Sequence, residues 1–217
     1  MDQAKNEAIL QELARLYPEA KAALHFQNPY QMLVATVLSA QCTDVKVNKV
    51  TPALFAAYSD PAHLAAAEPA QIEPYIQSCG IYHNKAKSLV AAARAIVSQY
   101  GGEVPNDFEA LQRLPGVGRK TANVVMANAF GADAIAVDTH VFRVSNRLGL
   151  AHAGDVLKTE LELQQAIPKA LWSTAHHWLI YHGRQVCAAR KPACERCTLR
   201  ELCDFAQAQA EPQAQAQ

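Results

Sequence analysis

The chain has 217 residues, with 20 lysine and arginine residues against 20 acidic ones, so its formal net charge is zero. This length is enough for a substantial core in one large domain or two modest ones, and the balanced charge gives no sign of a nucleic-acid partner from composition alone. The sequence has neither an apolar run long enough to span a bilayer nor a leading signal peptide, so we expect a cytoplasmic protein.

The composition indicates an all-α protein, because alanine is abundant and the alternation typical of strands is nearly absent. A first helix is expected over residues 3–17, where Pro18 closes it. Asn28 opens a second helix, and a third runs from residue 44 to about 58. Short helical pieces punctuated by prolines follow. A long helix comes next, with its inward face expected at Leu89, Val90, Ala93, Ile96 and Val97.

Two turns in this half of the chain hold residues of interest. Gln41 lies in the segment from Ser39 to Asp44, and Ile81 follows Gly80. Taken alone, Gln41 reads as a polar residue in a short loop, and Ile81 as one of the exposed apolar side chains that are commonplace on proteins.

The segment from Leu114 to Ala122 is the central pattern of the sequence. Its proline and two glycines make a tight turn between two helices, and the second helix runs from Arg119 to Gly131. The amides of such a turn sit at a helix N-terminus, which suits an anion such as a phosphate. Lys120 lies in the first helical turn. The positive end of a helix dipole disfavours an ammonium charge, and a lysine present as the free amine can act as a nucleophile. An ordinary turn with a solvated lysine explains these residues equally well.

Asp138 stands where the N-cap of the next helix, 139–148, belongs. Capping alone accounts for this residue, although it also holds the carboxylate rigidly. Two further helices are expected around residues 155–166 and 168–184. The histidines of the last one are interpreted as packing and hydrogen-bonding residues; they are His176, His177 and His182.

Four of the six cysteines fall within a short basic segment. They are Cys187, Cys194, Cys197 and Cys203. A disulfide framework is not expected without a secretion signal, so this spacing indicates a metal site. Zinc accepts four sulfur ligands, and so does a cubane iron–sulfur cluster, and the residues alone leave both open. The tail from residue 206 to 217, which alternates alanine and glutamine, is expected to be disordered.

The string Leu-Pro-Gly-Val-Gly-Arg-Lys-Thr-Ala from Leu114, followed by Val-Asp-Thr-His from Val137, resembles the endonuclease III family of helix-hairpin-helix DNA glycosylases. The cysteine spacing also matches the iron–sulfur loop of that family. The resemblance covers nearly the whole chain to Cys203. Small departures are Ile81, where the family usually has leucine, Cys42 in a variable place, and the extra tail.

The resemblance implies two helical lobes with DNA held between them. One lobe is expected to be residues 22–131, with a helix-hairpin-helix motif at about 108–129. The other combines residues 1–21 with 132–205, and its loop 187–203 holds a [4Fe–4S] cluster.

The implied reaction is removal of oxidised pyrimidines from double-stranded DNA, followed by β-elimination 3′ to the abasic site. Lys120 and Asp138 take the places of the catalytic residues, and the four cysteines above are the implied cluster ligands. The implied DNA contacts are Gln41, Ile81, Leu114, Gly116, Val117, Gly118, Arg119, Arg143, Arg190 and Lys191. The protein is expected to act as a monomer.

Two alternatives stay open at this point. An adenine-mismatch glycosylase shares the hairpin and the cluster but lacks the lysine at the place of Lys120 and carries a further C-terminal domain. A non-catalytic helix-hairpin-helix DNA-binding protein needs neither Lys120 nor Asp138.

Overall fold

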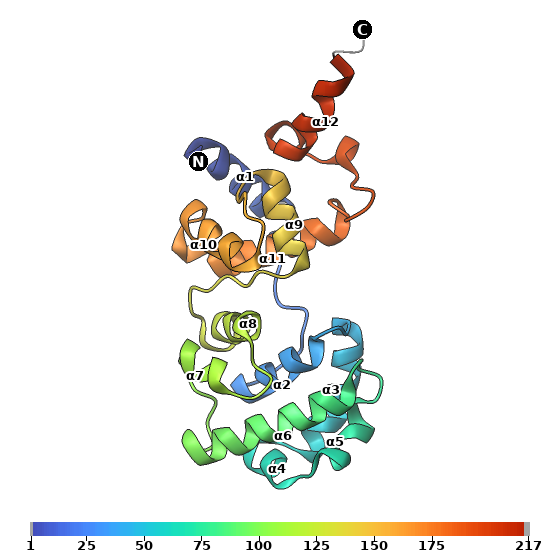
Figure 1. Cartoon of the computed structure of the whole chain (residues 1–217), viewed down its shortest axis with the longest axis vertical. Coiled ribbons are helices and arrows are strands. Elements are labelled where there is room, and N and C mark those ends of the chain that lie inside the picture. Colours follow the sequence, from blue (N-terminus) through green and yellow to red (C-terminus); the bar gives the residue numbers. More distant parts are fainter. Residues whose placement is uncertain (1, 215–217) are drawn as a thin grey trace. The chain divides into compact units, whose positions relative to one another are not determined.

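The computed structural model describes residues 2–214, and every regular element among them is a helix (Figure 1). The chain divides into two compact units. One is Ala22–Ala132, called the hairpin unit here. The other, called the cysteine unit, joins the segment up to Lys21 with the segment from Asp133 onward. The all-α class predicted from composition is confirmed. No helix in the described part of the chain is both long and apolar enough to cross a membrane.

The hairpin unit is built around a helix that is apolar on all sides. In chain order its helices are α2 (Pro29–Ser39), α3 (Asp44–Ala57), α4 (Pro61–Ala66), α5 (Pro69–Ile76), α6 (Tyr82–Gln99), α7 (Phe108–Arg113) and α8 (Arg119–Phe130). Every residue of α2 from Met32 to Leu38 is buried, as expected for a helix without a polar face. It packs against α3, α6 and α8, while α6 also carries α4 and α5.

Side-chain caps fix where these helices begin. The carboxamide of Asn28 accepts a hydrogen bond from the Gln31 amide, at 2.9 Å, and the Asp107 carboxylate accepts one from the Ala110 amide, at 2.7 Å. Thr43 does the same at the start of α3. Each cap satisfies an amide that the helix itself leaves without a partner. The helix start predicted at Asn28 is therefore a physical cap, and Thr43 is the cap residue of α3.

The cysteine unit packs the first helix against helices from the end of the chain. Its helices are α1 (Gln3–Leu16), α9 (Thr139–Leu148), α10 (Val156–Ala166), η1 (Lys169–Leu171), α11 (Trp172–Gln185), η2 (Cys194–Arg196), η3 (Arg200–Leu202) and α12 (Asp204–Ala214). Helix α11 lies against both α1 and α9. Ile9 and Leu13 of α1 are fully buried, together with Val144 of α9 and Leu179 of α11.

The tail differs from the disorder expected from residue 206 onward, because α12 continues to Ala214. Alanine and glutamine are strong helix formers, and packing anchors the start of this helix. Ala206 is buried, the Phe205 ring lies 4.4 Å from the Arg147 guanidinium carbon, and Lys5 of α1 forms an ion pair with Asp204. The sequence analysis predicted disorder because it did not anticipate these contacts. Residues 215–217 lie outside the described residues.

Candidate active site and metal centre

The turn between α7 and α8 can be made only by glycine at its centre. Gly116 has φ of 77°, in the left-handed region, and a Cβ atom there would lie 2.6 Å from the Cβ of Ser88. The Val117 amide donates to the Leu114 carbonyl at 3.1 Å, which closes the turn. Leu114 and Val117 are both buried in the core of the hairpin unit. The turn is therefore held rigidly, with its glycines on the surface.

Helix α8 carries Lys120 on the surface in its first turn. Gly118 is the N-cap residue and has no side chain with which to cap the helix. Ala122 and Val125 are fully buried and fix the helix, whereas Lys120 is exposed. The Arg119 guanidinium carbon lies 5.1 Å from the centre of the Phe108 ring, which links α8 back to α7. An exposed amine and uncapped helix amides thus share one helix end.

Two surface turns of the same unit hold strained residues. Gln41 has φ of 52° and Ile81 has φ of 53°, and they are the non-glycine residues with positive φ in the described part of the chain. A β-branched residue rarely adopts this conformation. Both side chains are exposed, Ile81 by 52%. The two turns touch, since a Cβ atom on Gly80 would lie 3.3 Å from the Gln41 carbonyl oxygen.

In the cysteine unit, Asp138 caps α9 with one carboxylate oxygen. Its Oδ1 accepts hydrogen bonds from the amides of His140 and Val141, both at 2.8 Å. The neighbours Val137 and Val141 are buried, and Asp138 itself is half-buried. Burial lowers the pKa of His140, and the Asp138 charge opposes that effect. The carboxylate is thus fixed in place, with Oδ2 not used by either capping bond.

Arg143 joins α9 to α11 and to the cysteine loop. Its guanidinium donates to the carbonyls of Gly183, at 3.0 Å, and Cys187, at 3.1 Å. A Cβ atom on Gly183 would lie 3.1 Å from Arg143 Nη2, so a glycine lets the two helices approach here. Arg143 was predicted as a DNA contact, and these bonds give it a role inside the unit. Arg190 and Lys191, also predicted as DNA contacts, are exposed on the loop.

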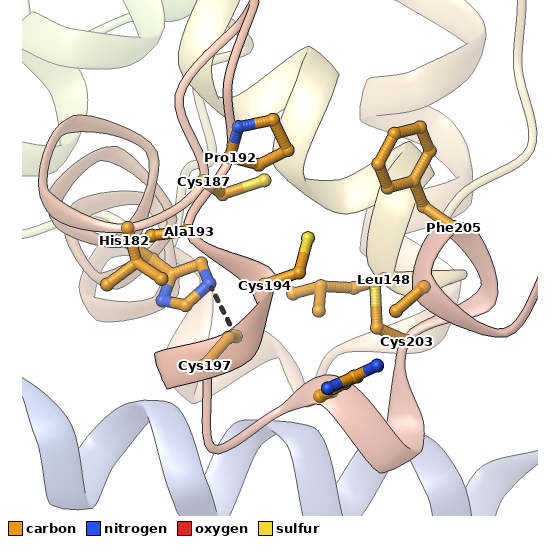
Figure 2. A pocket seen from close by; sticks show the side chains of 12 residues that line it. Leu148, His182, Cys187, Pro192, Ala193, Cys194, Cys197, Cys203 and Phe205 are labelled. Carbon is orange, nitrogen blue, oxygen red and sulfur yellow. Dashed lines mark hydrogen bonds between the residues drawn. The ribbon is translucent and has the colours of Figure 1, made fainter. Parts of the chain in front are cut away.

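The four C-terminal cysteines line one cavity. Figure 2 shows the sulfurs of Cys187, Cys194 and Cys203 turned toward a space beside Pro192, Leu148 and Phe205. Cys197 lines the same cavity. Burial raises the pKa of Cys197 and of Cys203, and the neighbouring thiols add to this in both cases. Cationic iron would offset such a cost by stabilising the thiolates.

The four thiols line this one shared space. Two kinds of group accept four sulfur ligands, a single tetrahedral zinc with bonds of about 2.3 Å and a cubane iron–sulfur cluster. Among the described residues, no set of three His, Cys, Asp or Glu side chains is arranged to hold a single metal ion.

Sequence reasoning missed the residues that hold this cysteine loop. Arg147 Nη1 lies 3.3 Å from Cys187 Sγ, and its guanidinium donates to the carbonyls of Ala188 and Ala189 at 2.8 and 2.9 Å. On the opposite side, His182 Nε2 lies 3.6 Å from Cys197 Sγ, as the dashed line in Figure 2 marks. No local pattern indicates these contacts, because Arg147 and Cys187 are 40 residues apart.

His182 is part of a buried hydrogen-bonded chain. Its Nδ1 lies 3.0 Å from the Tyr17 hydroxyl. Burial lowers the pKa of His182 to about 4 and raises that of Tyr17 to about 12, so both groups are neutral near pH 7. A proton on Nε2 then lets the ring donate to the Cys197 sulfur and accept from the tyrosine.

Comparison with known proteins agrees with this geometry. Residues 34–169 match the family model described as HhH-GPD superfamily base excision DNA repair protein. The chain is 54% identical to endonuclease III of Synechocystis sp., over 92% of this chain and 92% of that protein. It is 43% identical to endonuclease III of Escherichia coli strain K12, over 94% and 97%. Among solved structures it resembles a trapped endonuclease III–DNA covalent intermediate, with a TM-score of 0.91, 44% identity, and coverage of 97% of this chain and 99% of that one.

The chain belongs to the HhH-GPD superfamily of base excision DNA repair proteins. Within that class it is similar to endonuclease III over nearly its whole length. The predicted family, the predicted enzyme class of DNA glycosylase and abasic-site lyase, and the predicted partner, damaged DNA, are thereby confirmed.

Proposed function

We propose that the enzyme removes oxidised pyrimidines from double-stranded DNA and then cleaves the strand 3′ to the abasic site, with Lys120 as nucleophile. One observation carries this proposal. Lys120 is an exposed amine in the first turn of α8, directly after a rigid turn whose glycine amides can hold a phosphate. The printed name of a similar structure, a trapped covalent intermediate of endonuclease III with DNA, supports the same chemistry.

The chemistry requires the damaged nucleotide to leave the base stack, since its anomeric carbon is out of reach inside the duplex. The Lys120 amine attacks that carbon, the bond to the base breaks, and the base leaves with a proton. The sugar ring then opens to a Schiff base between the lysine nitrogen and C1′. This iminium acidifies C2′, and loss of the C2′ proton expels the 3′ phosphate.

Asp138 is proposed as the group that stabilises positive charge developing on the sugar and relays protons. Two hydrogen bonds from backbone amides to Oδ1 fix its position, so the carboxylate does not have to reorient during the reaction. Capping and chemistry therefore use different oxygens of one carboxylate. Preorganised charge of this kind is among the largest contributions to catalysis.

The remaining predicted contacts divide into positioning and stack-filling groups. The amides at Gly116 and Gly118 are proposed to hold a phosphate, and Arg190 with Lys191 to contact the backbone, which positions DNA without reading its sequence. Leu114 and Val117 are buried, so we propose that they contribute through their backbone. Gln41 and Ile81 are proposed to occupy the gap left by the extruded nucleotide, where an apolar side chain can act as a wedge.

A [4Fe–4S] cluster is proposed at Cys187, Cys194, Cys197 and Cys203. The cavity that the four thiols share and the similarity of the chain to endonuclease III support it. When bound, the cluster would cross-link the loop that carries Arg190 and Lys191. Protein made with ample iron should contain about four irons with matching sulfide, and stoichiometric zinc in that protein would overturn the assignment.

Borohydride trapping tests the nucleophile. The holoenzyme should give a covalent complex with a duplex that contains one oxidised pyrimidine, and Lys120→Ala should give none while it still binds that duplex. Lys49→Ala, which removes another exposed lysine of the same unit, is the matched control and should trap normally. A Lys120→Ala protein that still cross-links would assign the reaction to a different amine.

We further propose that the enzyme works as a monomer in the cytoplasm, beside the nucleoid. A DNA substrate and bacterial relatives support this location.

A further inference from the structure

Two cysteines outside the metal centre lie under the strained turns of the hairpin unit. Cys42 directly follows Gln41 and precedes Thr43, the N-cap residue of α3, and Cys79 directly precedes Gly80 and Ile81. Both are free thiols. Cys79 is fully buried and belongs to the core of the unit, whereas Cys42 is half-buried. Solvent therefore reaches Cys42 and not Cys79.

The two cysteines are neighbours. The turns that carry them are in backbone contact at Gly80 and Gln41, and the Cys42 side chain packs against the core to which Cys79 belongs. Main-chain hydrogen bonds hold both residues. The Cys42 amide donates to the Ser39 carbonyl at 3.1 Å, and the Cys79 amide to the Ile76 carbonyl at 2.9 Å. The backbone of each cysteine is thus held in place by its own hydrogen bond.

A buried lysine lies beside this pair. Lys85 is 4% exposed, and its Nζ donates to the Leu38 carbonyl at 2.8 Å. Burial raises the pKa of Cys79 to about 11, the Cys42 thiol adds to this, and the charges of Lys85 and Lys46 oppose it. Cys79 therefore keeps its proton, and Cys42 is the residue of the pair that an oxidant in solvent can reach. The thiolate is the form of a cysteine that reacts with oxidants.

We propose that Cys42 and Cys79 are a peroxide-sensitive thiol pair whose disulfide ties together the two turns that carry Gln41 and Ile81. Hydrogen peroxide oxidises the Cys42 thiolate to a sulfenic acid and releases hydroxide. The Cys79 sulfur then attacks the Cys42 sulfur, and the sulfenic oxygen leaves as water. Two thiols and one peroxide thus give one disulfide and two waters, and a small dithiol reverses the change.

The disulfide would alter the turns because its bond is short. Bonded sulfurs lie about 2.05 Å apart, closer than two thiols that are only in contact. Each cysteine is adjacent in sequence to a turn whose exposed residue has positive φ, so contraction acts directly on Gln41 and on Gly80–Ile81. The expected effect on DNA excision rests on the stack-filling role proposed above for those residues. The formation of the disulfide is independent of that role.

Peptide mapping of the oxidised holoenzyme tests formation. Full-length holoenzyme is treated with hydrogen peroxide, its remaining thiols are alkylated, and it is digested without reductant. The expected product is one cross-linked pair of peptides that contain Cys42 and Cys79, absent from Cys42→Ala and lost on reduction with dithiothreitol. Recovery of both cysteines alkylated, or of Cys42 as a sulfinic acid beside free Cys79, would overturn the proposal.

An activity comparison tests the consequence. The oxidised enzyme should excise a damaged base from paired duplex about tenfold more slowly, the scale expected when a strained backbone conformation is displaced. Its cleavage of a single-stranded abasic site should stay unchanged, and dithiothreitol should restore duplex excision. Cys42→Ala exposed to the same peroxide should keep full activity, which separates this effect from damage to the metal centre. A disulfide with unchanged duplex excision would refute the switch, and loss on both substrates would show general damage.

Different results would refute the stack-filling role of Gln41 and the disulfide. If Gln41→Ala leaves duplex excision unchanged in the reduced enzyme, the stack-filling role is wrong even where the disulfide forms. If no disulfide forms, the thiol pair is refuted whatever Gln41 does.

Discussion

Substitutions at Asp138 separate its capping role from its chemistry. Its Oδ1 holds two amides at 2.8 Å, and an asparagine oxygen can accept the same two bonds. Asp138→Asn then loses only the charge near the helix N-terminus, which contributes about 0.3–1 kcal/mol. Asp138→Ala loses the cap as well, at about 1–2 kcal/mol. For a chain of this size each kcal/mol lowers Tm by about 2–4 °C.

Base release should respond differently from stability. Both variants remove the carboxylate charge, so both should lose roughly 10²- to 10³-fold in single-turnover excision, the usual effect of losing one preorganised transition-state contact. Thermal unfolding followed by circular dichroism, and excision of one damaged pyrimidine from a labelled duplex, measure the two quantities on the same preparations. The asparagine variant is decisive because it should be nearly as stable as the parent and almost inactive.

Asp155 offers a matched control in the same unit. It caps α10 by accepting the Lys158 amide at 2.8 Å, and its side chain is about half exposed. Asp155→Ala should therefore lower Tm by an amount similar to Asp138→Ala and leave excision intact. Near-parental excision by Asp138→Asn, or activity that follows Tm across all three variants, would refute a catalytic Asp138 and leave capping as its role.

Three further outcomes are expected. Gln41→Ala should slow excision from paired duplex by about 10- to 100-fold, as the loss of a hydrogen-bonded contact allows, and should spare cleavage of single-stranded abasic sites; equal losses would mean that Gln41 shapes the fold. Burial, with His176 adding, lowers the pKa of His177 from 6.5 to about 4 in the folded state, so unfolding takes up a proton between these values. His177 alone then lowers the free energy of unfolding by about 3 kcal/mol as the pH falls from 6.5 toward 4, and His182 adds a loss over the same range, so His177→Gln should reduce this slope in denaturant titrations without removing it. Cys194→Ser should lower iron content and DNA affinity more than the rate of chemistry on bound DNA, and a variant with full iron would exclude Cys194 as a ligand.

Much of the fold could be predicted because the signals are local. A helix start depends on one side chain and an amide two or three residues later, as at Asn28 and Asp138. The hairpin is equally local, since the conflict that excludes a side chain at Gly116 lies at the turn itself. The four clustered cysteines are close in sequence, and so their common cavity was also within reach of prediction.

Contacts between distant segments could not be predicted in this way. Tyr17 and His182 are 165 residues apart, and only the packing of α1 on α11 brings them together. Arg147 reaches the cysteine loop through the packing of its own unit, and nothing in its neighbours distinguishes it from a solvated arginine. The prediction of a disordered tail was wrong for the same reason. The contacts that anchor α12 are made by Phe205 and Asp204, which lie outside the Ala/Gln pattern.

The conformation of Ile81 is the strongest case of tertiary structure overruling local preference. An isolated isoleucine avoids positive φ, yet Ile81 adopts it and begins α6, with its carbonyl accepting the amides of Asn84 and Lys85. Lys85 in turn is anchored to the Leu38 carbonyl of α2, so the helix start is held from outside the turn. Such strain persists only where surrounding contacts enforce it, and it concentrates at functional sites. The same contacts hold the exposed Ile81 side chain in place on the surface, as the wedge role proposed for it requires.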